Sequence, residues 1–417
     1  MSLVQSSKWG SRAFWGTGRP VGRRPSTFLR RVFEFDLVLI VAAVMMAALG
    51  AIMVYSATRS GLITNHLDPH YWLKRDVVFL GVGAAIMAVL SFVDYHVFER
   101  YWVVIYGAAI FTLFVVLLPH VGTHILGSQR WLQLGSFQFQ PSAFTGLAVI
   151  VSVAALMQRA EIPVQWRVIG KVLAVVVVAM GIVAKQPDLG SAIVIGIIAA
   201  TMLVVGGAQL RQLVVLGIAT ALGVWLILHL GLLHGYQVSR LTSFLHPHQG
   251  TNSTNYNLNQ SKIDIGSGGF FGKGLFHDQQ TNLQYVPEQQ TDFIFTAVGG
   301  QLGFVGACGV IVLYGVIAVR ILSAARRAID TFGTLLAAGA FSLLTFSVFE
   351  NAGMTIGITP ITGIPLPFMS YGGSADIAFF AALGITLSVS RTGRRSKSAP
   401  IPASSRMSPV GSGGWFR

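Results

Sequence analysis

The chain has 417 residues, of which 53% are hydrophobic and only 11% are charged. Because a soluble domain usually carries about 25% charged residues, this composition excludes an ordinary soluble protein and indicates a membrane protein. The net charge of +14 would suit nucleic-acid binding, but the basic residues gather in two tails and beside apolar segments. That distribution follows the positive-inside rule, so we expect the tails to lie near anionic membrane lipid and predict no nucleic-acid partner.

Ten apolar segments follow one another along the chain, each near the ~17–25 residues that a helix needs to cross the hydrocarbon core. They cover residues 37–57, 77–93, 102–119, 142–157, 168–184, 190–207, 213–233, 303–322, 332–349 and 375–390. Strands of a membrane barrel alternate in polarity and are only about ten residues long. We therefore predict an all-α polytopic membrane protein with about ten transmembrane helices and both termini in the cytoplasm.

The chain divides into two tails and one membrane domain. Residues 1–35 and 391–417 are rich in Ser, Gly, Pro and Arg, which predicts disordered basic cytoplasmic tails. The membrane domain covers residues 36–390, and its longest loop, 234–291, falls on the extracytoplasmic side between spans 7 and 8. Apolar residues are spread through this loop, so we expect it to pack against the domain. The loops on the other side are short, so chemistry is expected on the extracytoplasmic side.

Charged residues at that boundary are candidates for a site, because a charge there is costly unless it is paired or functional. In chain order, Arg130 stands beside Trp131 in GSQRWLQLG, and Lys185 and Asp188 stand in KQPDL. Each has a simpler interpretation: the Arg-Trp pair could anchor the protein at the interface, and Asp188 could cap a helix.

The long loop holds the remaining charged candidates. Lys273 stands in GSGGFFGKG, which is not a P-loop because Gly274 follows the lysine where Ser or Thr is required. The loop ends in YVPEQQTDFIF, with Glu288 and Asp292 before an apolar segment. A carboxylate among cations could act as a general base beside an anionic ligand. Alternatively, Thr291 and Asp292 simply begin a helix.

Two further stretches limit the interpretation. GIPLPF, with its two prolines, predicts a rigid non-helical turn or re-entrant loop within residues 358–374. His246, His248 and His277 have no fixed ligand spacing, so no metal site is assigned.

These stretches together resemble the SEDS family, the bacterial proteins of shape, elongation, division and sporulation. The resemblance covers about residues 36–390 and rests on motifs in a fixed order: VYSAT, GSQRWLQLG with FQPS, QPDLGSA, QSKIDIGSGGFFGKGL, PEQQTDFIF, LGFVG and GITPITGIPLPFMSYGGS. The sequences of IGSGGFFGKGL and PEQQTDF are closer to those of RodA-like elongation proteins than to those of FtsW-like division proteins.

The resemblance implies polymerisation of peptidoglycan glycan strands from lipid II at the outer face of the bacterial cytoplasmic membrane. The family's key acid corresponds to Asp292, which would be the catalytic base. Arg130 and Lys273, with Lys185, would offset the charge of the leaving diphosphate, together with a divalent cation (Mg or Mn). The family motifs also place further residues at the substrate: Trp131, Asp188, Gln260, Ser261, Glu288 and Ser370. The resemblance also implies a partner, a class B penicillin-binding transpeptidase.

The chain departs from the family pattern at several charged positions. The usual Glu and Lys after QPS are Ala143 and Gly146, and the usual Glu pair before LGFVG is Gly300-Gln301. Asp264 stands where the family usually has Ala. Two rival functions stay open. A lipid II flippase would share the substrate, the spans and the cations, and the loss of the charged residues would suit a non-catalytic scaffold that activates the transpeptidase.

Overall fold

The structure is a computed structural model that describes residues 35–118, 122–125, 128–135, 137–231, 238, 240 and 253–398. Our predictions for residues 1–34, for 399–417 and for most of the stretch 232–252 concern residues outside this set. One prediction made for the C-terminal tail is wrong: the last helix continues to Ser398, so residues 391–398 are helical.

Ten apolar helices make up most of the described part, in agreement with the ten predicted spans. Seven are long and apolar enough to cross a membrane: α2 (Leu37–Thr64), α3 (Tyr71–Phe92), α7 (Trp166–Lys185), α9 (Leu210–His229), α13 (Ile294–Arg327), α14 (Thr331–Ile356) and α15 (Gly373–Ser398). Three apolar helices are shorter: α5 (Trp102–Leu117), α6 (Pro141–Met157) and α8 (Leu189–Val205). The polytopic helical fold is therefore confirmed.

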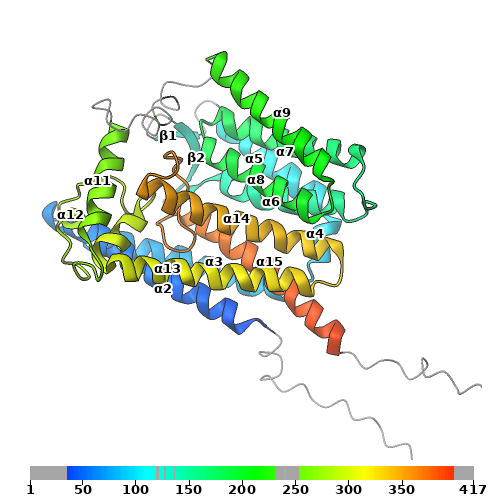
Figure 1. Ribbon diagram of the computed structural model, residues 1–417. Coiled ribbons are helices and arrows are strands. Elements are labelled where there is room, and N and C mark those ends of the chain that lie inside the picture. The colour runs from blue at the N-terminus through cyan, green and yellow to red at the C-terminus, as the bar shows by residue number, and fades with distance from the viewer. Residues whose placement is uncertain are drawn as a thin grey trace, which may run out of the picture.

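The helices lie side by side as a bundle with α14 and α15 inside (Figure 1). α15 packs along α3, and α14 lies against α13, α8 and α6. α9 is different, because Gln212 is its one buried residue. So large an exposed apolar surface suits lipid rather than water.

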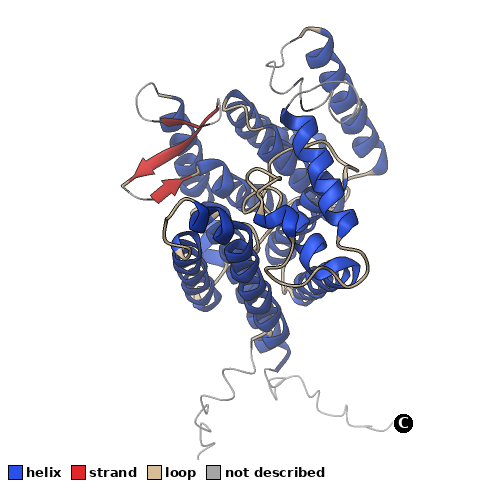
Figure 2. Cartoon of the chain, turned by 90° about the vertical axis from the view of Figure 1, so that its left-hand side faces the viewer, coloured by secondary structure: helices blue, strands red, loops and turns tan. Residues whose placement is uncertain are grey.

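One end of the bundle, which we call the loop end, carries the non-helical elements (Figure 2). A three-stranded antiparallel sheet, β1 (Gly122–Ile125), β2 (Ser128–Leu134) and β3 (Phe137–Phe139), lies between α5 and α6. The prediction of an all-α chain missed this sheet. Its strands are too short to give a clear alternating pattern, and Gly135 with positive φ turns β2 into β3.

The long loop packs as predicted where it is described. α11 (Ser253–Ser267) lies against α13 and α14, and the short α12 (Gln279–Asn282) lies against α2. α13 begins at Ile294 rather than at residue 303, because Gly303 (φ +66°, ψ −165°) breaks the helix without ending it. The first segment of α13, Ile294–Leu302, is therefore a separate helical piece that begins two residues after Asp292.

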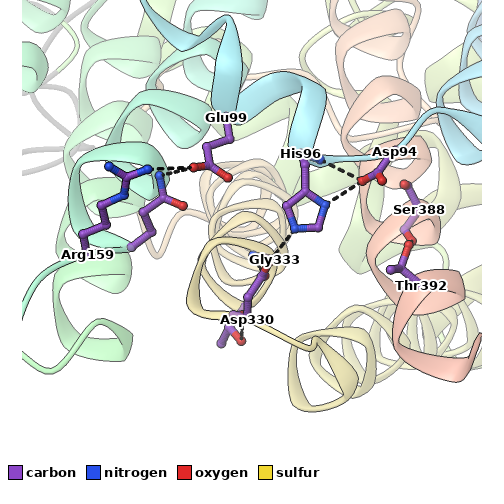
Figure 3. A network of polar contacts seen from close by, with 10 residues as sticks. Asp94, His96, Glu99, Arg159, Asp330, Gly333, Ser388 and Thr392 are labelled. Atoms are coloured by element: carbon purple, nitrogen blue, oxygen red, sulfur yellow. Dashed lines mark hydrogen bonds and ion pairs between the residues drawn. The ribbon is translucent and has the colours of Figure 1, made fainter. Parts of the chain in front are cut away.

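A polar network at the opposite end joins helices that are distant in sequence (Figure 3). His96, in α4 (His96–Arg100), lies 2.7 Å from a carboxylate oxygen of Asp94 through Nδ1 and 2.7 Å from one of Asp330 through Nε2. Asp330 also caps α14 by accepting the N–H of Gly333 at 2.7 Å. Burial lowers the pKa of His96, but the two carboxylates outweigh it and the net shift is upward from 6.5.

Candidate active site

Asp292 lines a cavity of about 390 Å³ at the loop end of the bundle. Five segments of the chain meet there: the start of α3, the sheet with the start of α6, residue 240, the PEQQTD turn, and the 363–375 loop. The lining residues are Trp72, Arg75, Phe79, Arg130, Trp131, Gln138, Gln140, Arg240, Glu288, Gln290, Thr291, Asp292, Gly363, Pro365, Tyr371, Gly372, Gly373, Ser374 and Ala375. Two carboxylates and three arginines therefore share one cavity.

The main chain on both sides of Asp292 is firmly held. Asn351 of α14 donates its Nδ2–H groups to the carbonyl of Asp292 and to that of Ile364, each at 2.8 Å. Before Asp292, the carbonyl of Glu288 accepts the N–H of Thr291 at 3.1 Å and its hydroxyl at 3.0 Å. A rigid turn thus presents the Asp292 side chain to the cavity.

A helix does begin just after Thr291 and Asp292, at Ile294, as the simpler interpretation predicts, but neither of their side chains caps it. The N-cap of α13 is Phe293, and no side chain caps it. Thr291 uses its hydroxyl within the turn instead. The carboxylate of Asp292 is therefore free of a capping role.

The electrostatics of the cavity favour a carboxylate with raised proton affinity. Burial raises the pKa of Asp292 from 3.8, although Arg240 and Arg130 oppose the shift. Glu288, which is exposed and adopts φ +52°, adds to the shift. A base that holds a proton more tightly than a free carboxylate is better matched to general-base catalysis near neutral pH.

Arg130 is buried and forms an ion pair with Asp188. The guanidinium lies 3.7 Å from Asp188 Oδ1 and over the Trp131 ring, 5.7 Å from its centroid. Asp188 also caps α8, since it accepts the N–H of Ser191 at 3.1 Å, and it accepts the hydroxyl of Ser142 at 2.9 Å. The interpretation of Asp188 as a helix cap is therefore confirmed. Asp188 also pairs with Arg130, which was not predicted, and its contact with substrate stays a prediction.

Three of the predicted substrate residues line the cavity, namely Arg130, Trp131 and Glu288. The others lie elsewhere. Lys185 is at the exposed end of α7, and Gln260 is half-buried on α11. Ser261 is buried and donates to the carbonyl of Thr355 at 2.8 Å, while Ser370 accepts the N–H of Leu366 at 2.8 Å. These contacts give both serines a structural role.

Lys273 also lies away from the cavity lining. Its ammonium group binds Asp278 Oδ1 at 2.9 Å. The prediction that Lys273 contacts substrate therefore gains no support from its position.

Sequence reasoning missed several residues of the cavity. Trp72, Arg75, Arg240 and Tyr371 line the cavity, and none of them was predicted as a site residue. Arg240 lies near Asp292, because a Cβ on Gly363 would be 3.1 Å from Asp292 Oδ2 and 3.5 Å from an Arg240 nitrogen. The sequence KRD at residues 74–76 could have indicated Arg75 as a site residue, since it puts two cations at a span boundary.

The departures from the family pattern occupy two places. Ala143 and Gly146 line a smaller cavity of about 60 Å³, which shares Gln140 and Gly363 with the main one. Ala143 has only a methyl group and Gly146 has no side chain, so this space stays open. Gly300 instead lies on α13 beside Asp264.

The described residues contain no group of three or more His, Cys, Asp or Glu side chains placed to bind a metal ion. The cavity lining offers two carboxylates, Glu288 and Asp292. Magnesium often takes only one or two protein carboxylates when phosphates supply other ligands, so these residues fit a metal held mainly by a bound diphosphate.

Fold and cavity together define a multi-pass membrane protein with an arginine-rich site around one partly buried aspartate. Residues 36–395 match the family model described as cell cycle protein, which groups FtsW, RodA and SpoVE. The chain belongs to this family, the SEDS family.

Relatives from different branches of the family cover most of the chain. The probable peptidoglycan glycosyltransferase FtsW of Trichlorobacter lovleyi is 34% identical over 86% of this chain and 94% of its own length. The peptidoglycan glycosyltransferase MrdB of Escherichia coli K12 is 37% identical over 76% of this chain and 85% of its own. The stage V sporulation protein E of Bacillus subtilis is 34% identical over 86% and 98%.

Solved structures show the same fold. A chain of a peptidoglycan synthase complex, described as coordinating polymerization and crosslinking, aligns with a TM-score of 0.73 at 28% identity, over 86% of this chain and 98% of that one. The rod shape determining protein RodA of Thermus thermophilus aligns with a TM-score of 0.63 at 29% identity, over 86% and 97%.

Proposed function

We propose that this protein polymerises peptidoglycan glycan strands from lipid II, a disaccharide-pentapeptide on undecaprenyl diphosphate. The observation that carries the proposal is Asp292, partly buried in a cavity that it shares with Arg75, Arg130 and Arg240. A base and several fixed cations are what glycosyl transfer from a diphosphate requires.

In the proposed reaction, Asp292 takes the proton from the 4-hydroxyl of the acceptor sugar. That oxygen forms a bond to the anomeric carbon of the donor sugar as the bond from this carbon to the diphosphate breaks. The diphosphate leaves with the bonding electrons from the opposite face, so an α-linked donor gives a β-1,4 link. The raised pKa of Asp292 lets its carboxylate hold the proton during the transfer.

The arginines would stabilise the leaving diphosphate. Arg130 is the best placed of them, because Asp188 and Trp131 fix its guanidinium before substrate arrives. Preorganised charges cost no rearrangement at the moment of reaction. A divalent cation, Mg or Mn, would add positive charge there, held mainly by the diphosphate with Glu288, which leaves Asp292 free to act as the base.

We place the cavity on the extracytoplasmic side, with both termini in the cytoplasm. The support is the distribution of basic residues, including Arg320 and Arg327 at the end of the bundle opposite the cavity. The cross-linking partner would be a class B penicillin-binding transpeptidase, in line with the synthase complex that contains a similar chain.

The cellular role that we propose is elongation and shape control, because the sequences of IGSGGFFGKGL and PEQQTDF are RodA-like. A role in division is the alternative, because similar relatives carry both FtsW and MrdB names. Depletion separates the two: loss of an elongation enzyme gives round cells, and loss of a division enzyme gives filaments.

The activity itself is tested with purified protein, fluorescent lipid II and the transpeptidase with its cross-linking blocked. Polymer is expected when this protein is present and absent when the transpeptidase is used alone. Lipid II that crosses a vesicle membrane without polymer would establish the flippase. Absence of both activities, with the partner bound, would leave the scaffold.

A further inference from the structure

A second open space, of about 540 Å³, borders the cavity on the side of the sheet. Its lining residues are Tyr71, Arg75, Gln133, Gly135 and Gln138, and we call it the outer groove. Arg75 and Gln138 also line the cavity around Asp292, so the two spaces adjoin. The volume of the groove lies within the range of about 300–1,000 Å³ that is usual for small-molecule sites.

The hairpin of β2 and β3 supplies the two amides of the groove. Gln133 and Gln138 pair directly across the strands, so their side chains lie on one face of the sheet. Phe137, next to Gln138, points to the other face, where its ring centroid lies 5.4 Å from that of Phe79 in α3. The aromatic face of the hairpin therefore packs on the bundle, and the amide face borders the groove.

The hairpin is held in shape without a ligand. Gly135, with φ +62°, makes the turn, and Gln133 Nε2 donates to its carbonyl at 2.5 Å. At the other end of β3, Ser374 of α15 donates its hydroxyl to the carbonyl of Gln138 at 3.2 Å and accepts the N–H of Gln140 at 3.0 Å. Because the groups are placed in advance, a ligand loses less free energy in ordering them.

A row of aromatic rings connects the groove with the cavity. The rings of Tyr71 and Trp72 meet edge to face at 5.2 Å between centroids, and those of Trp72 and Tyr371 meet at 4.8 Å. Arg75 donates to the Tyr71 hydroxyl at 2.7 Å, and its guanidinium lies 5.5 Å from the centroid of that ring. A ligand that reaches from the cavity into the groove would therefore pass along aromatic surface.

The lining of the groove suits an uncharged ligand that is rich in hydroxyl groups. Glutamine amides both donate and accept hydrogen bonds, as hydroxyls require, and aromatic rings offer an apolar face to the C–H groups of a sugar. Among the described residues that line the groove, Arg75 is the single charged one. The cavity has three arginines and two carboxylates. A charged diphosphate therefore fits the cavity, and neutral sugars fit the groove.

We propose that the outer groove is a saccharide subsite that binds the sugars of the growing glycan strand next to the reacting one. This assignment rests on the proposed function, which places the reacting sugar and the diphosphate in the cavity. The strand then contacts the protein at two places, so its reacting end stays close to Asp292 after each addition. The groove thereby controls how long a strand becomes before it is released.

Gln133 is the residue to change, because it lines the groove and not the cavity. Gln133→Ala removes the amide, and Gln133→Trp fills the groove with a side chain that suits a β-strand. Gln279 is the matched control, since it is an exposed glutamine on α12 and lines neither space. Gln279→Ala and Gln279→Trp make the same chemical changes there.

The first measurement is the binding of a tetramer of β-1,4-linked N-acetylglucosamine to the full chain in detergent, by saturation-transfer NMR. This probe has the sugar linkage of the strand but no diphosphate and no lipid. We expect Gln133→Ala to bind it about fivefold more weakly, the effect of about one lost hydrogen bond. We expect Gln133→Trp to abolish binding and both Gln279 variants to bind as wild type does.

The second measurement is the length of the glycan strands made from lipid II, with the transpeptidase bound and its cross-linking blocked. Strands are compared at equal consumption of lipid II, so that a difference in overall rate is removed. We expect shorter strands from both Gln133 variants, the shortest from Gln133→Trp, and wild-type lengths from both Gln279 variants.

The outcomes separate the groove from the proposed function. Absence of tetramer binding to wild type, equal binding by Gln133→Trp, or equal strand lengths would each overturn the saccharide subsite. Tetramer binding that is lost in Gln133→Trp, in a protein that makes no polymer, would keep a sugar site in the groove and refute the proposed function. Polymer from a wild type that does not bind the tetramer would support the function without the groove.

Discussion

The buried pair of Arg130 and Asp188 should be the most sensitive electrostatic contact of the site. In Asp188→Ala, Arg130 loses its carboxylate at 3.7 Å, and α8 loses the cap made to the N–H of Ser191. Removing one partner of a buried pair costs about 3–5 kcal/mol, and losing a cap costs about 1 kcal/mol. Arg130 borders the cavity, where water can hydrate it, so we take the lower end of the range for the buried pair. Together with the lost cap, we expect the free energy of unfolding to fall by about 4 kcal/mol.

The assay is reversible unfolding in detergent, with polymerisation measured on the folded fraction. Asp68→Ala is the matched control, since Asp68 pairs with Lys74 at 2.7 Å, a shorter distance, but on the exposed surface. We expect no measurable loss of stability from the control. Asp188→Ala with the stability and turnover of the control would refute the argument that Asp188 holds Arg130.

Two further predictions concern the helix break and the opposite end. Gly303→Ala should prevent folding to a stable protein, because φ is +66° and the added Cβ would overlap the backbone of Gly272; normal thermal stability of purified G303A would contradict this. His96 should stabilise the protein below pH 6.5, and the contribution should be lost as pH rises through its raised pKa. In His96→Gln the unfolding midpoint should lose this pH dependence, whereas a dependence equal to wild type would show that contacts with Asp94 and Asp330 do not titrate.

The sequence predicted the spans well because a long apolar segment in a membrane must satisfy its backbone hydrogen bonds internally, which it does as a helix. Even the short segments 142–157 and 375–390 became helices, α6 and α15. It failed at the start of α13, because Gly303 looked like a boundary between loop and helix. Only the fold shows that a second segment fills the break and lets the helix continue.

The site was predicted in part for a similar reason. Asp292 and Arg130 stand in recognisable motifs, and the structure brings both to one cavity. Arg240 and Tyr371 reach that cavity from other loops, which no local pattern indicates. Lys273 was assigned to substrate, but folding pairs it with Asp278, whose burial could not be read from the chain.

The most direct test of the central claim compares Asp292→Asn with Glu288→Gln. Both variants neutralise a carboxylate of the same cavity, and both keep the side-chain shape. Lipid II binding and glycan product are measured on each preparation with the transpeptidase bound. If Asp292 is the base, Asp292→Asn binds lipid II and makes no polymer, while Glu288→Gln, which keeps the base, makes less polymer than wild type but still polymerises. Polymer from Asp292→Asn at the wild-type rate would contradict the account.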